Sequence, residues 1–321
     1  MGRKLALAAV VVLLVYAPLA VDAWSEDLVV DTQFLADKIG RPDWVILDTR
    51  TPEEFLEGHI QGAINLGKRA DKALRDPTHR SYTIVPAIEK TLGEAGIGSD
   101  AHIILYGTAI DVYYNTVPFW VLEYLGCNSP SLKCTVHYYD GGIERWESEG
   151  GKLDQTDTKL PASQFTARVV SSRLATTAEV LEVVKKRKKA VVIDARTEAE
   201  YSGSDIRALR GGHIPGAINI KVQKNYSADT YRMLPLSELE ALYKSISRSS
   251  RIISHCQTGT RSTFTYIVLR LLGYKNVANY DDSWIVYGSN VTLPVESEQW
   301  YDFFEMNRTL KELKEEMKQI Q

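Results

Sequence analysis

The sequence is short of cysteine and has no marked excess of either charge. Three cysteines occur among 321 residues, and 38 lysines and arginines nearly balance 41 aspartates and glutamates. This balance argues against a nucleic-acid-binding protein, which needs a basic surface to displace phosphate counterions. With 44% hydrophobic and 25% charged residues, the composition is that of a folded globular protein without long disordered stretches. The length corresponds to two domains.

The apolar run near the N-terminus, residues 5–17, is shorter than the roughly 18 residues that a membrane-spanning helix needs. Arg3 and Lys4 precede it and small residues follow it, which is typical of a secretory signal peptide; an uncleaved anchor is the alternative. We therefore expect a signal peptide at residues 1–23 and an exported protein, periplasmic or secreted, with no further membrane association. Thiols in such compartments tend to become disulfides.

Several blocks of sequence occur twice in the same order. Residues 45–50 are echoed by residues 191–196, and residues 58–65 return as residues 212–219. Three shorter blocks repeat in the same way: 54–55 as 200–201, 103–107 as 252–256, and 139–140 as 280–281. Self-similarity of this kind indicates a duplicated domain.

We expect the two copies to form domains at residues 24–152 and 165–300, joined by a linker at residues 153–164. Each copy alternates short apolar runs rich in β-branched residues, such as residues 191–194, with helical segments such as residues 177–189. This alternation predicts an α/β fold in which each domain is a mainly parallel sheet flanked by helices.

The last segment, residues 301–321, has the pattern of an amphipathic helix. Its apolar residues recur at three- and four-residue steps among lysines and glutamates: Leu310, Leu313, Met317 and Ile320. We expect this helix to pack on its own domain, and packing against the helix of a partner is the alternative.

In the second copy, a buried strand ends in a cysteine. Cys256 follows residues 252–255, and a loop of small and polar residues then leads through Arg261 into an apolar helix at residues 263–272. Three effects would favour the Cys256 thiolate, the nucleophilic form of the thiol. These are the N-terminus of the helix, backbone N–H groups folded into an anion-binding nest, and the charge of Arg261. Gly259 permits the tight turn of the loop.

A cysteine at the end of a strand is often only a small buried apolar residue. Core packing does not explain a polar, glycine-containing loop that ends in an arginine, so we favour a catalytic role for Cys256. The preceding His255 would point to the opposite face of its strand and is expected to be structural.

At these positions the chain resembles the tandem-domain rhodaneses, a family of sulfurtransferases. The motifs Asp-x-Arg, Gly-His-Ile-x-Gly-Ala and Cys-x-x-Gly-x-Arg stand in the family's order, and the resemblance covers nearly all of the chain between the signal peptide and the C-terminal helix. In such proteins the N-terminal domain is typically inactive, and here Gly107 stands where the second copy has Cys256. The resemblance therefore implies two rhodanese-like domains, a catalytic C-terminal one and an N-terminal one that walls the cleft.

The resemblance also implies a two-step sulfur transfer without a metal or an organic cofactor. The Cys256 thiolate would take a sulfane sulfur from a small donor such as thiosulfate, and the resulting persulfide would pass it to a thiophilic acceptor such as cyanide or a thiol, a protein thiol included. Arg261 would bind the donor or shape the loop. The persulfide would lie among the backbone N–H groups of the loop residues Gln257, Thr258, Gly259, Thr260 and Ser262.

Two other functions stay open. Cys-dependent phosphatases and arsenate reductases use the same fold, but their loop is one residue longer than the six residues from Cys256 to Arg261, so the shorter loop favours sulfur. The other alternative is a non-catalytic sulfur carrier or binding module that docks on a redox partner.

The chain departs from the better-known two-domain members at Glu200, where they have an arginine that helps to bind the donor. Arg207 and Arg210, in the loop that follows, are candidates to supply this charge to the substrate. The loop sequence also differs from the Cys-Gly-Ser-Gly-Val-Thr form associated with mercaptopyruvate. We therefore favour thiosulfate or another persulfide donor over mercaptopyruvate.

The other two cysteines, Cys127 and Cys134, lie in one loop of the first copy. Together with His137 they lack a fourth ligand and the usual zinc spacing, so we expect no metal site there. In an exported protein a local disulfide between them is the favoured interpretation. Cys256 is then the cysteine without a partner.

Overall fold

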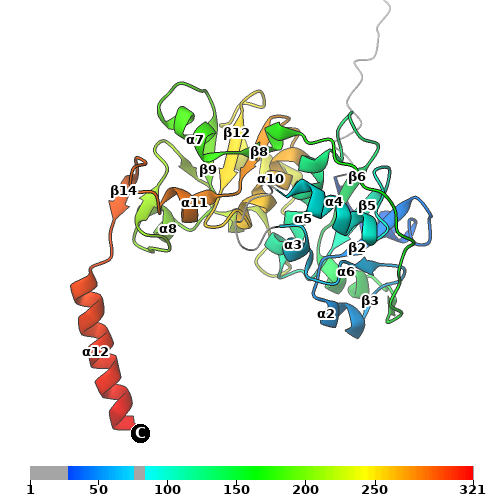
Figure 1. The fold of residues 1–321 in the computed structure, drawn as a ribbon, viewed down its shortest axis with the longest axis horizontal. Helices are drawn as coiled ribbons and strands as arrows, with labels where there is room; N and C mark the ends of the chain where they lie inside the picture. Colours follow the sequence, from blue (N-terminus) through cyan, green and yellow to red (C-terminus); the bar gives the residue numbers. More distant parts are fainter. Residues whose placement is uncertain (1–27, 76–83, 321) are drawn as a thin grey trace, which may run out of the picture.

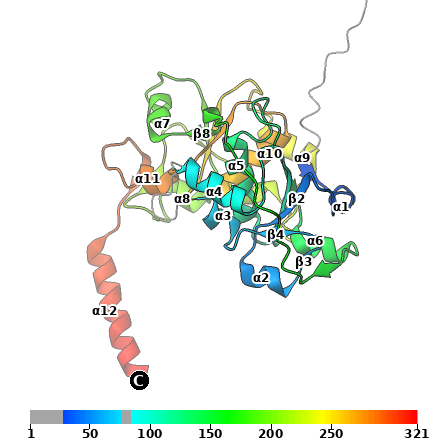
Figure 2. The same cartoon turned by 45° about the vertical axis from the view of Figure 1, so that its right-hand side comes forward.

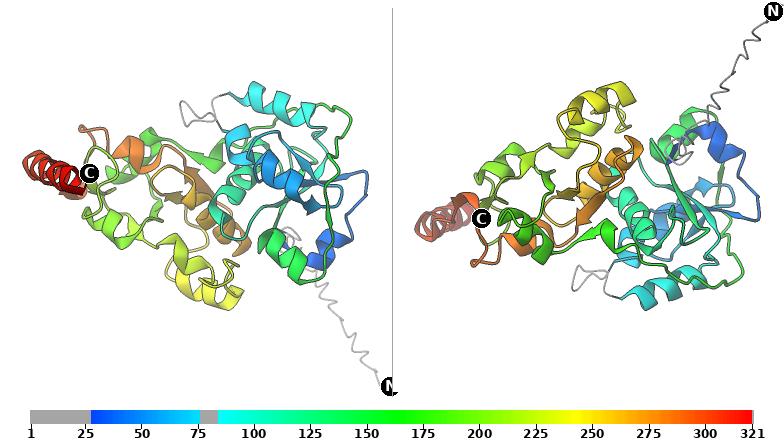
Figure 3. Two further views of the ribbon diagram at one scale, coloured as in Figure 1. Left: turned by 90° about the horizontal axis from the view of Figure 1, so that it is seen from below. Right: turned by 90° about the horizontal axis from the view of Figure 1, so that it is seen from above.

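The computed structural model describes residues 28–75 and 84–320, so the predicted signal peptide lies outside the described residues. Two α/β domains lie side by side, each built on a five-stranded parallel sheet flanked by helices (Figure 1). The predicted fold class is confirmed. Seen from below and from above, the domains occupy opposite halves of the molecule (Figure 3). The linker runs along the N-terminal domain, where Ser163 N–H donates to the carbonyl of Gly93.

The sheet of the N-terminal domain has the strand order β1-β6-β5-β2-β4, with every neighbouring pair parallel. Its central strands are buried on both faces, which suits their continuous apolar sequences. The strands are β1 (Val29–Val30), β2 (Trp44–Asp48), β4 (Ile64–Asn65), β5 (His102–Tyr106) and β6 (Thr135–Tyr139). The helices are α1 (Thr32–Ala36), α2 (Pro52–Glu57), α3 (Ala70–Ala73), α4 (Val85–Glu94), α5 (Val112–Leu125) and α6 (Gly142–Ser148).

The sheet of the C-terminal domain repeats this topology in the order β8-β13-β12-β9-β11, again with parallel pairs. The equivalent order supports the duplication read from the sequence. The strands are β8 (Leu174–Ala175), β9 (Val191–Asp194), β11 (Ile218–Asn219), β12 (Ile252–His255) and β13 (Val277–Tyr280). The helices are η1 (Ser171–Arg173), α7 (Thr177–Val184), α8 (Glu198–Ser202), η2 (Val222–Asn225), α9 (Leu236–Tyr243), α10 (Arg261–Leu271) and α11 (Ser283–Tyr287).

Each domain also carries a short antiparallel ribbon beside its sheet. In the N-terminal domain β3 (His59–Ile60) pairs with β7 (Leu153–Asp154). In the C-terminal domain β10 (Gly211–His213) pairs with β14 (Glu296–Gln299).

The two domains meet where α5 packs against α10, and one apolar core runs through both of them. Polar contacts cross the same interface. The hydroxyls of Thr116 and Thr263 lie 2.8 Å apart, and Arg270 forms an ion pair with the buried Glu123 at 3.1 Å. A continuous core and a buried ion pair hold the domains in one arrangement, so a site built between them has defined walls.

The C-terminal helix α12 (Phe303–Ile320) stands away from both domains (Figures 1 and 2). Residues 303–318 are all exposed, and the side chains of Phe304 and Met317 are 90% and 63% exposed. The helix therefore does not pack on its own domain, contrary to the expectation from its amphipathic pattern. Periodicity predicted the helix but not the surface that covers it.

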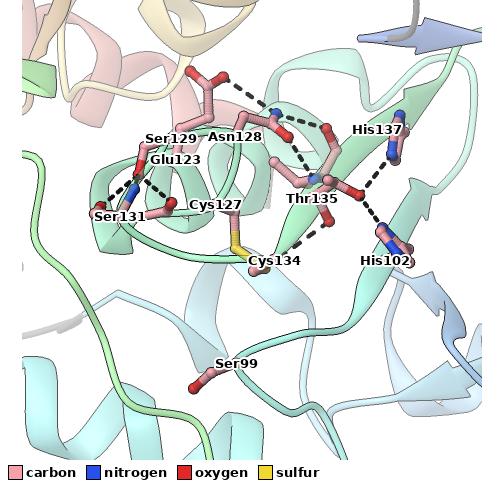
Figure 4. The surroundings of a disulfide bond; sticks show 12 residues. Ser99, His102, Glu123, Cys127, Asn128, Ser129, Ser131, Cys134, Thr135 and His137 are labelled. Carbon is pink, nitrogen blue, oxygen red and sulfur yellow. Dashed lines mark hydrogen bonds between the residues drawn. A yellow bond between two sulfur atoms is a disulfide. The ribbon is translucent and has the colours of Figure 1, made fainter. Parts of the chain in front are cut away.

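Cys127 and Cys134 form a disulfide that closes the turn between α5 and β6 (Figure 4). Between them Asn128 adopts a left-handed conformation, with φ of 55°. The Asn128 side chain bonds to both the N–H and the carbonyl of Val136. The disulfide therefore reinforces a turn that already has its own hydrogen bonds.

In the described part of the chain, no helix is long and apolar enough to cross a membrane.

Candidate active site

Cys256 directly follows β12, the central strand of the C-terminal sheet, and the loop that it begins runs into α10 at Arg261. The carboxyl ends of parallel strands are where open α/β sheets bind their ligands. The loop therefore lies where the topology predicts a site.

The carbonyl groups of this loop face outward, toward hydrogen-bond donors. Two of them accept bonds from the segment after β13: Trp284 N–H donates to the carbonyl of Cys256 at 3.1 Å, and Ile285 N–H donates to that of Gln257 at 2.9 Å. Two more accept bonds from other parts of the domain: Asn279 Nδ2 donates to the carbonyl of Gly259 at 3.1 Å, and Thr263 N–H donates to that of Thr260 at 3.2 Å. When the carbonyls of a tight loop turn outward, its N–H groups turn inward and form an anion-binding nest. The inner side of this nest faces the sulfur of Cys256.

The Cys256 thiol is fully buried, and burial by itself raises its pKa. The positive charge of Arg261 lowers the pKa. Hydrogen bonds from the Ser262 and Thr258 N–H groups and from the Ser262 hydroxyl lower it further, so the pKa of the thiol lies below its ordinary value. The Ser262 hydroxyl oxygen lies 3.6 Å from Sγ. A lowered pKa favours the thiolate, which is the nucleophilic form of cysteine, over the neutral thiol.

Arg261 is held in place by Glu200. Both terminal nitrogens of Arg261 donate to the Glu200 carboxylate at 2.7 Å. Burial alone would raise the pKa of Glu200, but the hydrogen bonds and charge of Arg261 outweigh burial and hold the pKa at about 2. Glu200 also accepts the N–H of Thr197 at 3.1 Å and so caps α8. The acidic residue therefore fixes the arginine whose charge lowers the pKa of Cys256.

A cavity of about 420 Å³ opens above the loop, between the two domains. From the C-terminal domain, the cavity is lined by Arg207, Gln257, Thr258, Thr260 and Arg261. From the N-terminal domain, it is lined by Asp71, Lys72, Arg75, Tyr113 and Tyr114. The N-terminal group could not be recognised from the sequence, because these residues lie far from Cys256 in sequence and belong to no repeated motif.

The two arginines suggested for donor binding occupy different places. Arg207 lines the cavity, with its side chain 51% exposed and one guanidinium nitrogen 3.2 Å from Glu200. Arg210 is not among the described residues that line the cavity. Its buried guanidinium donates to backbone carbonyls and pairs with an acidic side chain: Gly288, Asn290, Leu293 and Glu298. This placement does not support the expectation for Arg210, which is buried away from this cavity and holds the segment after α11.

His255 is buried on the strand beneath the loop, where its Nδ1 lies 3.2 Å from the carbonyl of Cys256. Burial lowers its pKa, and the opposing charge of Asp194, 3.6 Å from Nε2, does not restore it. A neutral imidazole that contacts the backbone of Cys256 is suited to a structural role.

The equivalent loop of the N-terminal domain has no room for a nucleophile. A Cβ added at Gly107 would lie 2.1 Å from Asn115 Oδ1 and 2.6 Å from Thr49 Oγ1. The N–H of Ala109, in the same loop, donates to the carboxylate of Glu144 at 2.8 Å. The space taken by the Cys256 side chain in one domain is thus filled by polar side chains in the other.

No group of three potential His, Cys, Asp or Glu metal ligands occurs among residues 28–75 and 84–320.

The family model for the rhodanese-like domain matches the chain twice, over residues 31–149 and 176–289. A protein of Mycolicibacterium smegmatis, provisionally named thiosulfate sulfurtransferase, is 31% identical to this chain and covers 84% of it and 98% of its own length. The thiosulfate sulfurtransferases of Corynebacterium glutamicum and Pseudomonas aeruginosa are 29% and 27% identical; each covers 84% of this chain, and the alignments cover 90% and 97% of their own lengths.

Among solved structures, the chain is similar to an anaerobic ergothioneine biosynthesis enzyme from Chlorobium limicola, solved in complex with trimethyl histidine. The TM-score is 0.73 at 19% identity, and the match covers 84% of this chain and 70% of that one. Similarity at this level of identity concerns the fold alone.

Proposed function

Because the chain belongs to the rhodanese-like family and is a sulfurtransferase, we propose that it moves a sulfane sulfur from thiosulfate or a similar donor to a thiophilic acceptor through a persulfide on Cys256. One observation carries this proposal. The buried thiol of Cys256 has a lowered pKa and faces the charge of Arg261 and inward N–H groups of its own loop.

In the first half-reaction the Cys256 thiolate attacks the outer sulfur of thiosulfate. A bond forms between Sγ and that sulfur, the S–S bond of thiosulfate breaks, and sulfite leaves with the electron pair. The outer sulfur of the new persulfide carries the negative charge into the nest, where the N–H groups and Arg261 stabilise it.

In the second half-reaction a nucleophile such as cyanide or a thiol attacks the outer sulfur of the persulfide. The S–S bond breaks and its electron pair returns to Sγ, which restores the thiolate. Covalent catalysis of this kind divides one difficult transfer into two easier ones. The residues that stabilise the free thiolate also make it a better leaving group in this step.

The charges around the cavity favour an anionic donor. Arg207 and Lys72 line the cavity, with side chains 51% and 59% exposed, so we propose that they attract the sulfonate end of thiosulfate. Arg261 is already engaged by Glu200, and its contribution is to stabilise the sulfur anion. The loop sequence, which differs from the form associated with mercaptopyruvate, favours thiosulfate or another persulfide donor.

We also propose that the protein acts outside the cytoplasm, in the periplasm or as a secreted protein. The pattern of residues 1–23 supports export. The Cys127–Cys134 disulfide supports it independently, because disulfides persist in oxidising compartments. Fractionation of cells that express the full chain, with N-terminal sequencing of the product, tests this proposal; an unprocessed cytoplasmic chain contradicts it.

Intact mass spectrometry tests the sulfurtransferase mechanism directly. After incubation with thiosulfate, the protein should gain one sulfur atom that cyanide removes as thiocyanate, and Cys256→Ser should gain none. If the wild-type protein gains no sulfur from any of several donors, the mechanism is wrong; if the serine variant gains it equally, the nucleophile is wrong. Rapid hydrolysis of p-nitrophenyl phosphate would instead support a phosphatase. A persulfide that no small acceptor can discharge would support a sulfur carrier.

A further inference from the structure

Arg75 belongs to the N-terminal domain, yet its guanidinium lies against the outer side of the Cys256 loop. Its Nη1 donates to the Thr260 hydroxyl at 2.9 Å, and its Nη2 donates both to the carbonyl of Thr258 and to the carboxylate of Asp281. The side chain is only 10% exposed. One arginine from the first domain therefore contacts two residues of the catalytic loop and the residue that follows β13.

Thr258 connects Arg75 to the thiol. The Thr258 N–H is one of the groups that lower the pKa of Cys256, whereas its carbonyl accepts the hydrogen bond from Arg75. The donors to the other four loop carbonyls, described above, come from the C-terminal domain. Closure of the nest at Thr258 thus depends on a donor from the neighbouring domain.

The contact between Arg75 and the loop is tightly packed. Gly259 has a φ of +75°, and a Cβ there would lie 2.3 Å from Asp281 Oδ1 and 2.8 Å from Arg75 Nη2. The loop therefore needs glycine at this position both for its backbone conformation and for the close approach of Arg75 and Asp281. A guanidinium packed this closely leaves the loop little freedom to move.

A reciprocal contact occurs in the other half of the duplicated structure. Asp140, the equivalent of Asp281, accepts the N–H of Met233 from the C-terminal domain at 3.0 Å. The segment after β4 in the N-terminal domain thus contacts Asp281 of the C-terminal domain, and the segment after β11 in the C-terminal domain contacts Asp140 of the N-terminal domain. Arg75 adds to this pattern, because it also binds Thr258 and Thr260 of the catalytic loop itself.

Building on the function proposed above, we propose that Arg75 is a positioning residue which the N-terminal domain supplies to the active site. Its planar fork holds Thr258, Thr260 and Asp281 together and thereby fixes the inward N–H groups that stabilise the thiolate and the persulfide. The N-terminal domain is then a working part of the catalytic loop, and not only a wall of the cavity.

The test measures the thiolate of Cys256 in the full chain. Ultraviolet absorbance is followed against pH for the wild-type protein, Arg75→Ala and Arg75→Lys, each after subtraction of the same protein with Cys256→Ser. We expect the pH midpoint of the Cys256 titration to rise by about one pH unit in both Arg75 variants. The rate of sulfur loading from thiosulfate near neutral pH should fall by roughly tenfold. Lysine keeps the charge but not the fork, so a wild-type midpoint in Arg75→Lys would overturn the positioning role.

A milder variant covers the case in which the Arg75 variants fold poorly. Thr260→Val keeps the shape of the side chain and removes only the acceptor of Nη1. It should raise the midpoint by a smaller amount than Arg75→Ala, and an unchanged midpoint would count against the proposal.

Arg270→Ala is the matched control, because Arg270 also forms a buried ion pair across the domain interface but lies on α10 away from the loop. This variant should lose thermal stability without a shift of the Cys256 midpoint. An equal shift in Arg270→Ala and Arg75→Ala would assign the effect to domain docking in general and overturn the proposal.

The thiolate titration does not depend on sulfur transfer, so the two proposals fail separately. A wild-type protein that gains no sulfur contradicts the proposed function and leaves the titration valid. A wild-type protein that gains sulfur, with Arg75 variants that titrate normally, contradicts only the role of Arg75.

Discussion

The carboxylate of Glu200 accepts hydrogen bonds from both terminal nitrogens of Arg261 in a bidentate ion pair, each bond 2.7 Å long. The Glu200 side chain is 1% exposed and that of Arg261 is 15% exposed. The sequence suggested that an acidic residue at this position removes a donor-binding charge. In the structure, Glu200 instead orients the cation next to Cys256.

Glu200→Gln should make the protein less stable at neutral pH, and the difference should shrink in acid. The pKa of Glu200 falls from 4.5 to about 2 in the folded protein, so its contribution is fully present above pH 4.5 and is lost as the pH falls toward 2. The shift corresponds to about 3 kcal/mol of unfolding free energy at pH 7. Urea unfolding of both proteins at pH 7 and near pH 3 measures this, and we expect the difference to fall by more than half. A difference that does not change with pH would show that Glu200 acts by packing alone.

Arg261→Ala should raise the pKa of the Cys256 thiol, because it removes the charge that most strongly opposes the effect of burial. The rate of sulfur loading near pH 7 should fall by about tenfold for each unit of that rise, and should recover as the pH increases. Arg261→Lys keeps a cation near the sulfur and should retain part of the rate. Loading rates from about pH 6 to pH 9, followed by intact mass, distinguish this from a loss that is the same at every pH, which would mean that the loop itself has collapsed.

Gly107→Cys should not create a second active site. The new side chain would overlap with Asn115 and Thr49, so we expect a loss of about 1–3 kcal/mol of unfolding free energy, as for other overpacked cores. In a Cys256→Ser background this variant should gain no sulfur from thiosulfate. Sulfur on residue 107 would show that the N-terminal loop can open into a nest, and would refute the steric argument that this loop has no room for a nucleophile.

The fold and the position of the Cys256 loop could be predicted from the sequence because both depend on local patterns. Apolar runs that alternate with helices predicted the two parallel sheets, and a strand that ends in Cys256 before a glycine-containing loop and Arg261 predicted the nest. The repeated blocks identified the second copy without any information on contacts. In each case the residues that carry the signal lie within a few positions of one another, or recur in the same order.

The features that could not be predicted depend on contacts between distant residues. Arg75 lies more than 180 residues before the loop that it contacts, and no local pattern marks it. Arg207 and Arg210 looked alike in sequence, but burial under the segment after α11 removes Arg210 from the cavity. The position of Arg75 depends on the docking of the two domains, and that of Arg210 depends on packing within the C-terminal domain. Sequence periodicity contains neither.

Replacement of Cys127 and Cys134 by alanine should lower stability without a change in sulfur transfer. The disulfide closes a loop with a sequence separation of 7, for which the entropy of the unfolded chain predicts a loss of about 2.5 kcal/mol. Urea unfolding of the double variant measures the loss, and intact mass after thiosulfate measures loading of Cys256. The double variant is preferable to chemical reduction, because a reductant would also remove the persulfide. A loss of sulfur loading in the folded variant would mean that these cysteines take part in the transfer.

Removal of residues 303–321 should leave the two domains as stable and as active as in the full chain. The side chains of residues 303–318 are exposed, so the deletion uncovers no core. The thermal midpoint should change by less than about 2 °C, which is no more than a change of 1 kcal/mol in unfolding free energy produces in a protein of this size. The double variant Leu310→Lys and Leu313→Lys is the control, because it removes two apolar side chains, which are 45% and 49% exposed, while it keeps the chain length. A clearly lower midpoint in both proteins would show that α12 packs on the domains in solution, since an exposed helix cannot contribute to their unfolding free energy.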